Sequence, residues 1–186
     1  MISSTWLLYF SQPAADRGLY GGVKGKSIRS VVEIGIGSGL RTQRLLEVLS
    51  WRADNLPLRY TGIDLFEARP QDQPGLSLKQ AFHDLRPKHV TVKLVPGDPY
   101  SALLRVANSL AGTDLVIISA DQDQESLERA WTYLPRILHN DSLIFREACE
   151  SKPVGKAPAK SSYQKLTLLE IQRLAAASAR AQRRAA

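Results

Sequence analysis

Three glycines at alternate positions follow a hydrophobic run near the start of the chain. The stretch from Val31 to Leu40, VVEIGIGSGL, predicts a buried strand that enters a glycine turn and then a helix. Glycine allows backbone conformations that other residues avoid, and it leaves the backbone uncovered for a ligand. In doubly wound α/β sheets, nucleotide-like ligands bind at the carboxyl ends of the strands where the strand order reverses. We therefore expect Gly35, Gly37 and Gly39 to form part of a ligand site.

The spacing of these glycines separates the classes of nucleotide. A dinucleotide fingerprint requires Gly or Ala at position 40, where this chain has Leu40. A phosphate-binding loop requires Lys followed by Ser or Thr after the glycines, and this pair is missing from the sequence. The turn is instead preceded by Glu33, and an acidic residue suits a cationic ligand better than a phosphate.

Two further acids end the next two predicted strands. Asp64 follows the run Tyr60 to Ile63, and Asp98 follows Leu94 to Gly97. A carboxylate at the end of the second strand can accept hydrogen bonds from both hydroxyls of a ribose. Either acid alone is more often a helix N-cap than a ligand-binding residue. Three acids in order at three successive strand ends, Glu33 included, indicate one shared site.

The E-x-G-x-G-x-G arrangement after a hydrophobic strand resembles the first motif of class I S-adenosylmethionine (SAM) dependent methyltransferases. The resemblance covers about residues 30 to 146. It implies SAM as the cofactor, which carries an ammonium and a sulfonium but no phosphate. It implies that Asp64 holds the ribose and Asp98 the adenine amino group. The implied cofactor-binding residues are Glu33, Gly35, Gly37, Gly39, Asp64 and Asp98.

The segment after the fourth predicted strand departs from that family. It is distantly similar to the Asp-Gly-x-His segment of small-molecule O-methyltransferases, but this chain has Ser119, Ala120 and Gln122 at those three places. The usual metal-binding carboxylate is therefore absent, and we expect any activity to need no metal. Asp121 is a weak candidate for a catalytic base, while Asp121 or Asp123 is expected to be the N-cap of the following helix.

Other side chains offer less to catalysis. The three histidines, His83, His89 and His139, fall within or beside predicted helices, away from the strand ends, and are expected to be structural. Tyr20 lies in the glycine-rich stretch 17–25 and is expected to help close the pocket. Cys149 is the only cysteine and is expected to be a buried small hydrophobe, because it has no partner for a disulfide or a thiolate metal site.

Short β-branched runs alternate with helix-period segments between Ser30 and Arg146, which predicts an α/β fold. We expect a doubly wound, Rossmann-like sheet of about five parallel strands in the order 3-2-1-4-5, with helices on both faces. The family's usual last two strands are expected to be lacking, so the fifth strand would need cover from a C-terminal helix at Tyr163 to Ala177 or from a second subunit in a homodimer. The expected strands are Ser30 to Ile36, Arg59 to Asp64, Val90 to Pro96, Asp114 to Ser119 and Ser142 to Arg146.

The chain of 186 residues is expected to form one SAM-binding domain at residues 1–150, followed by a linker, a fraying helix and a basic tail at 151–186. Its 44% hydrophobic and 23% charged residues exclude a disordered chain. The net charge of +7 has its excess in the C-terminal segment, which disfavours nucleic acid as the partner of the folded body. With neither a secretory signal nor a membrane span predicted, we expect a cytoplasmic protein.

These observations predict a SAM-dependent methyltransferase that acts on an unidentified small-molecule acceptor. A second hypothesis is a non-catalytic SAM-binding domain with a scaffold or regulatory role. The substitutions at Ser119 and Gln122 and the missing strands are the reasons to consider it. A nucleic-acid methyltransferase is disfavoured because the Asn/Asp-Pro-Pro-aromatic signature is replaced by Ser119 to Gln122. The two main hypotheses differ in product formation and agree on SAM binding.

Overall fold

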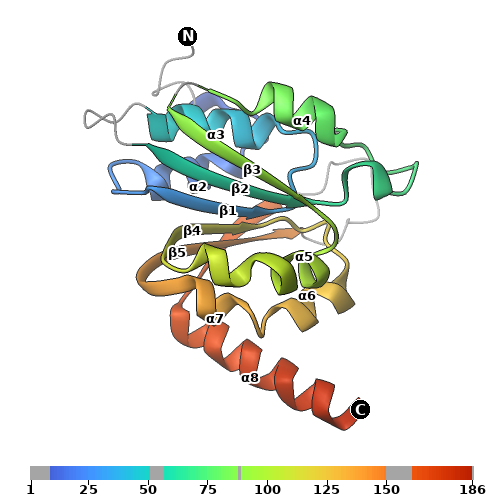
Figure 1. Ribbon diagram of the computed structural model, residues 1–186. Helices are drawn as coiled ribbons and strands as arrows, with labels where there is room; N and C mark the ends of the chain where they lie inside the picture. The colour runs from blue at the N-terminus through green and yellow to red at the C-terminus, as the bar shows by residue number, and fades with distance from the viewer. Residues whose placement is uncertain (1–8, 51–56, 88, 150–160, 186) are drawn as a thin grey trace, which may run out of the picture.

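The computed structural model describes residues 9–50, 57–87, 89–149 and 161–185, and it contains a six-stranded sheet in the order β3-β2-β1-β4-β5-β6 (Figure 1). The first five strands are parallel, which confirms the predicted α/β class and the order 3-2-1-4-5. The order reverses between β1 and β4, where ligands bind in sheets of this kind. The strands are β1 (Ser30–Ile34), β2 (Leu58–Asp64), β3 (Val90–Pro96), β4 (Thr113–Ile118), β5 (Leu138–Cys149) and β6 (Ser161–Leu166).

Helices cover both faces of the sheet (Figure 1). One face carries α2 (Asp16–Val23), α3 (Leu40–Ser50) and α4 (Leu78–Asp84), and the other carries α5 (Pro99–Val106), α6 (Gln124–Ala130), α7 (Leu134–Ile137) and α8 (Leu168–Ala185). Two 3-10 turns, η1 (Phe66–Ala68) and η2 (Ala107–Leu110), lie in the connections. None of the helices within the described residues is long and apolar enough to cross a membrane.

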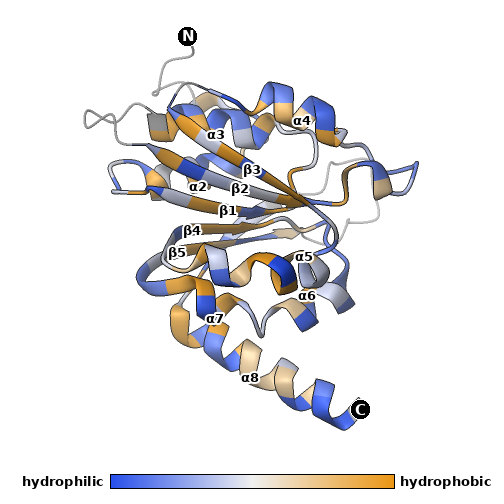
Figure 2. Cartoon of the chain, in the orientation of Figure 1, coloured by the Kyte–Doolittle hydropathy of each residue, from blue (hydrophilic) through white to orange (hydrophobic). Residues whose placement is uncertain are grey.

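Each face of the sheet has its own hydrophobic core, because successive side chains of a strand point to opposite faces. Val31 packs with the α2 to α4 side, and Val32 packs with the α5 to α8 side. In β4, Leu115 and Ile117 face the first core, while Val116 and Ile118 face the second. Burial on both faces explains why apolar residues predominate in the central strands β1 and β4 (Figure 2).

Short side-chain signals mark several helix ends. Ser77 and Gln80 form a capping box at the start of α4, with the Gln80 amide donating to Ser77 Oγ over 3.1 Å. Asp123 caps α6 by accepting from the Ser126 amide over 2.7 Å, as one of the two alternatives for this segment predicted. Gly112 follows η2 with a φ of 77°, a left-handed conformation that favours glycine at such a stop.

The sixth strand corrects the prediction that both of the family's last strands are missing. β6 pairs antiparallel with β5, from Ile144 opposite Leu166 to Cys149 opposite Ser161. Tyr163 therefore belongs to a strand and not to the start of the C-terminal helix. Because β6 covers β5, the predicted need for a helix or a second subunit at that edge disappears. The predicted linker falls mostly at 150–160, and this segment and the Cys149 side chain lie outside the described residues.

The C-terminal helix is longer than expected. Thr167 begins it with a capping box, since its own N–H donates to Glu170 Oε2 over 2.7 Å and the Glu170 amide returns to Thr167 Oγ1 over 3.2 Å. These hydrogen bonds lower the pKa of Glu170. The helix then continues to Ala185, beyond the expected end at Ala177. Its last turns are hydrophilic and extend away from the sheet (Figure 2).

Candidate functional site

The glycine turn joins the end of β1 to the start of α3 through three left-handed residues. Gly35, Gly37 and Gly39 have φ values of 89°, 61° and 76°, which β-carbon-bearing residues rarely adopt. A Cβ on Gly35 would lie 2.6 Å from Ser119 Cβ, and one on Gly39 would lie 2.6 Å from Leu76 Cδ1. A Cβ on Gly37 would meet nothing within 4 Å. The turn is therefore packed at both ends and open in the middle, where bare backbone faces free space.

Asp64 lies directly beside this turn. Its Oδ2 accepts hydrogen bonds from the backbone amides of Ile36, at 2.7 Å, and Gly37, at 3.0 Å. Its Oδ1 accepts from the Phe66 amide at 3.2 Å and from the guanidinium of Arg69. The side chain is buried, with 3% of its surface exposed. The structure thus brings two of the predicted site elements, the glycine turn and Asp64, into direct contact.

Asp98 is the N-cap of α5. Its Oδ1 accepts from the amides of Tyr100 and Ser101, both at 3.1 Å, and from the hydroxyl of Ser126, while Oδ2 accepts from the Ser101 hydroxyl. Burial raises the pKa of Asp98, but the hydrogen bonds from Ser101 and Ser126 outweigh it and lower the pKa to about 2. Asp98 is joined to the site through its neighbour Gly97, whose amide donates to the Asp64 carbonyl over 2.9 Å.

Glu33 lies inside the protein, where both oxygens of its carboxylate accept hydrogen bonds from other side chains. It is fully buried, and its Oε1 accepts from Arg41 Nε at 2.7 Å. Its Oε2 accepts from the hydroxyls of Thr42, at 2.7 Å, and Tyr60, at 2.6 Å. Burial and the charge of Glu33 both raise the pKa of Tyr60. In this conformation Glu33 holds the start of α3 through Arg41 and Thr42, and Arg41 in turn donates to the Gly35 carbonyl of the glycine turn.

The end of β4 brings its substituted residues against the glycine turn. The Ser119 amide donates to the Ile34 carbonyl at 2.8 Å. A Cβ on Gly35 would also lie 2.4 Å from Gln122 Nε2, so this side chain packs on the turn. Asp121, the weak catalytic candidate, is exposed and accepts from Gln122 Nε2 at 2.8 Å. The Asp121 carboxylate is therefore connected to the glycine turn through Gln122.

Three residues that no sequence pattern indicated complete this edge: Arg41 from α3, Glu147 from β5 and Tyr163 from β6. Arg41 Nη1 donates to Glu147 Oε2 at 3.2 Å and to the Tyr163 hydroxyl at 3.0 Å, while Nη2 donates to the Gly35 carbonyl at 2.5 Å. Burial lowers the pKa of Arg41, but Glu33 and the other partners outweigh it and hold the pKa well above its usual value. One guanidinium therefore links the glycine turn to β5 and β6.

A buried acid lies behind this cluster. Asp16, at the start of α2, accepts from the Tyr163 hydroxyl at 3.2 Å and from the Tyr20 hydroxyl at 3.5 Å. Burial raises the pKa of Asp16, and the nearby charge of Arg41 opposes this shift only in part. Tyr20 itself is fully buried in α2, so the expectation that it closes the pocket is wrong. Burial raises the pKa of Tyr20 and also that of Tyr163.

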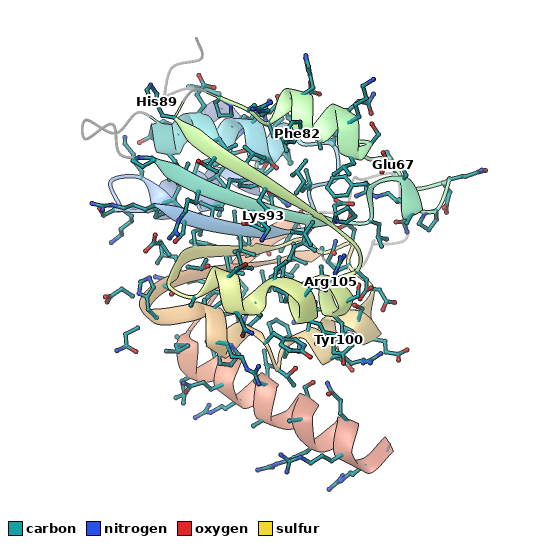
Figure 3. The ribbon with its side chains drawn as sticks, viewed as in Figure 1. Glu67, Phe82, His89, Lys93, Tyr100 and Arg105 are labelled. Carbon is teal, nitrogen blue, oxygen red and sulfur yellow. The ribbon has the colours of Figure 1, made fainter. Side chains whose placement is uncertain are left out.

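The histidines lie away from the glycine turn. Figure 3 shows His89 at the start of β3, on the opposite side of the molecule from Glu67, which follows the end of β2. His83 is exposed on α4 beside Asp84, and His139 contacts Asp114 at 3.1 Å near the start of β4. Among the described residues, no group of three His, Cys, Asp or Glu side chains is arranged to hold a metal ion.

No known protein-family profile matches this chain, and no curated protein matches its sequence. Solved structures are similar to it at a distance. The methyltransferase domain of bacterial CtHen1-C is 16% identical, with a TM-score of 0.48 over 72% of this chain and 64% of that one. A SAM-dependent methyltransferase from Thiobacillus denitrificans, solved with S-adenosyl-L-homocysteine, is 15% identical, with a TM-score of 0.46 over 83% of this chain and 59% of that one.

A third similar structure, a precorrin-6y C5,15-methyltransferase from Geobacter metallireducens, is 15% identical, with a TM-score of 0.48 over 75% of this chain and 64% of that one. The chain spans about three fifths of the length of these three structures. By its own strand order the chain is a Rossmann-like α/β protein, and the solved structures to which it is similar here are those of methyltransferases.

Proposed function

We propose that this chain binds SAM and transfers its methyl group to a small-molecule acceptor without a metal ion. The observation that carries the proposal is the contact between Asp64 and the glycine turn, in which a buried carboxylate adjoins bare backbone at Gly37. An open backbone beside a carboxylate suits a ribose-bearing ligand that has no phosphate. The site also lies at the point where the strand order reverses.

The residues at this edge fit SAM with one rearrangement. Each oxygen of Asp64 already has two hydrogen-bond donors, so ribose hydroxyls would have to replace donors on Oδ1. The Arg69 guanidinium is the donor that can leave, because it belongs to a side chain that can rotate, whereas the Phe66 amide belongs to the backbone; Arg69 also donates to the Pro74 carbonyl. Asp98 would meet the adenine amino group, and Glu33 would support the site through Arg41.

When bound, SAM supplies an electrophilic methyl group on a sulfonium, whose carbon–sulfur bond breaks with its electron pair left on sulfur. The contribution of the chain is to hold donor and acceptor in line, and alignment of this kind is worth ~7 to 11 kcal/mol in favourable cases. Arg41 and Asp64 hold the backbone of the glycine turn from two sides, at Gly35 and at Ile36 and Gly37. The site is therefore formed before ligand binds, apart from Arg69.

Calorimetric titration with SAM and S-adenosylhomocysteine (SAH) tests the proposal. The wild type should bind both ligands, and Asp64→Ala should weaken binding by ~1 to 3 kcal/mol, since hydrogen bonds to a charged group are lost. The matched control is Asp141→Ala, an exposed residue near the start of β5. Equal or tighter binding of a nicotinamide dinucleotide would overturn the cofactor assignment.

A screen with radiolabelled methyl groups then separates transfer from binding alone. Small amines and hydroxyl compounds are the acceptors to offer, with and without a chelator. Labelled product that persists in the chelator supports a metal-independent methyltransferase. SAH binding without a product from any acceptor would favour a SAM-binding domain with a scaffold or regulatory role.

A further inference from the structure

Glu147 places a carboxylate beside Ser119, the residue at the end of β4 that stands where the Asp-Gly-x-His segment has its Asp. In β5 the residue before it, Arg146, lies opposite Ile118, so Glu147 stands beside Ser119 at the carboxyl edge of the sheet. Its Oε2 accepts from the Ser119 hydroxyl at 3.1 Å and from the Ala120 amide at 3.4 Å. The neighbouring strand thus supplies the acid that Ser119 does not.

The carboxylate is held by one oxygen, which leaves the other for a ligand. Oε2 also accepts from Arg41 Nη1 at 3.2 Å, so its donors come from α3, β4 and the turn after β4. Oε1 has no hydrogen-bond partner within the part of the chain that the structure describes. The side chain is 16% exposed, which keeps it reachable at the rim of the site.

Arg41 fixes the distance between Glu147 and the glycine turn. The same guanidinium that donates to Glu147 donates from Nη2 to the Gly35 carbonyl at 2.5 Å. Ser119, the other partner of Glu147, packs against Gly35, since a Cβ added there would lie 2.6 Å from Ser119 Cβ. Glu147 is therefore linked to the glycine turn, which is proposed to bind the cofactor, through Arg41 and separately through Ser119.

The charges at this edge favour a ligand that is cationic or gives up a proton. Arg41 pairs with both Glu33, at 2.7 Å, and Glu147, so its single positive charge is shared between two carboxylates. Glu33 is fully buried, whereas Glu147 is partly exposed and is the one of the two carboxylates that a ligand can reach. Negative charge left at a partly desolvated edge attracts cations and stabilises a proton in transit.

We propose that Glu147 Oε1 faces the position of the transferred methyl and accepts the proton of an acceptor whose attacking atom is an amine nitrogen or a hydroxyl oxygen. This assignment rests on the proposed function. As the acceptor atom bonds to the methyl carbon it loses one proton, which passes to Glu147 Oε1 and then to solvent water. The bond pair that the methyl group releases stays on the departing sulfur, so atoms and charge balance.

The test compares two SAM analogues that differ at the methyl position. Sinefungin has an amine-bearing carbon where SAM has its methyl-bearing sulfur, while SAH has a bare sulfur there. An amine at this position should form a charge-assisted hydrogen bond with Glu147. Glu147→Gln should therefore weaken sinefungin by about tenfold and leave SAH within about twofold. Glu147→Asp keeps the charge and should retain part of the preference for sinefungin.

Glu125→Gln is the matched control, because Glu125 is an exposed acid in the first turn of α6 and should leave both affinities unchanged. Unchanged SAH affinity also shows that each variant is folded. The assignment is overturned if Glu147→Gln weakens both ligands equally, which indicates a structural role, or weakens neither. If the wild type binds neither analogue, the proposed function itself fails, and this result is distinct from the other two.

Discussion

Replacing Glu33 with glutamine should cost the protein much of its stability, because the change leaves a buried cation without its nearest counter-charge. Glu33 is fully buried and accepts from Arg41, Thr42 and Tyr60 at 2.6 to 2.7 Å. The Arg41 side chain is 12% exposed. Removing one partner of a buried ion pair destabilises by ~3 to 5 kcal/mol. Glutamine keeps the shape and one acceptor oxygen, and Arg41 keeps Glu147, so we expect the low end, about 3 kcal/mol.

For a domain of this size each kcal/mol shifts the melting temperature by about 2 to 4 °C, so Glu33→Gln should melt about 6 to 12 °C below wild type. The assay is urea unfolding of wild type, Glu33→Gln, Arg41→Met and the double variant. Because either single change strands a buried partner, the double variant should be more stable than additivity predicts, by about 0.5 to 3 kcal/mol. Glu128→Gln, at an exposed acid that accepts a hydrogen bond from the Gln124 side chain, should stay within about 0.5 kcal/mol of wild type.

Two results would refute this reasoning. A loss below about 1 kcal/mol in Glu33→Gln would mean that water or the remaining partners compensate Arg41 fully. Strict additivity in the double variant would mean that the 2.7 Å contact between Glu33 and Arg41 carries no coupling energy.

Two further predictions concern Asp16 and the C-terminal end. Burial raises the folded-state pKa of Asp16, so its contribution to stability is present below the unfolded value of about 3.9 and is lost as pH rises through the folded pKa. Asp16→Asn should therefore gain stability relative to wild type between about pH 4 and pH 7, and an equal difference at both ends of a melting series would contradict this. Deletion of residues 180–186 should change the melting temperature by less than about 2 °C and leave SAH affinity unchanged, because the removed arginines are exposed and the Gln182 side chain reaches the rest of the fold through a long hydrogen bond to the Arg129 carbonyl, at 3.4 Å. A drop of several degrees would show that the last turns of α8 stabilise the sheet.

Signals that reside within a few residues of sequence predicted much of the fold. The strand that enters the glycine turn, the capping box of Ser77 and Gln80 and the N-cap at Asp123 each depend on neighbours in the chain, and the structure has all three. β6 depends instead on a partner strand. Its sequence, SSYQKL, has no β-branched residue and only two large apolar side chains, so hydrophobic alternation did not identify it.

The glycine-rich stretch around Tyr20 was misinterpreted for a related reason. Glycines normally indicate a loop, yet here α2 contains three of them and stays helical because Leu19, Tyr20 and Val23 are buried on one side. A Cβ on Gly22 would lie 2.7 Å from Phe145 Cζ, so glycine is needed for the helix to approach the sheet. The sequence shows the glycine but not the aromatic ring that requires it.

The polar part of the site could not be predicted from spacing, because its members are far apart in the sequence. Arg41 meets Glu147 and Tyr163 across separations of 106 and 122 residues, and Tyr163 meets Asp16 across 147. No local pattern encodes such contacts. What the motif did encode is the backbone that these groups hold, namely three left-handed glycines between a strand and a helix.

Asp64 and Glu33 act on opposite sides of that backbone. Asp64 accepts from the amides of Ile36 and Gly37 on one side of the turn. Glu33 orients Arg41, which donates to the Gly35 carbonyl on the other side. A carboxylate thus holds two backbone amides of the turn, and a guanidinium holds one of its carbonyls. Both of these side chains are largely buried. A backbone fixed from both sides loses little entropy when a ligand binds, which is the condition under which binding energy can be used for alignment.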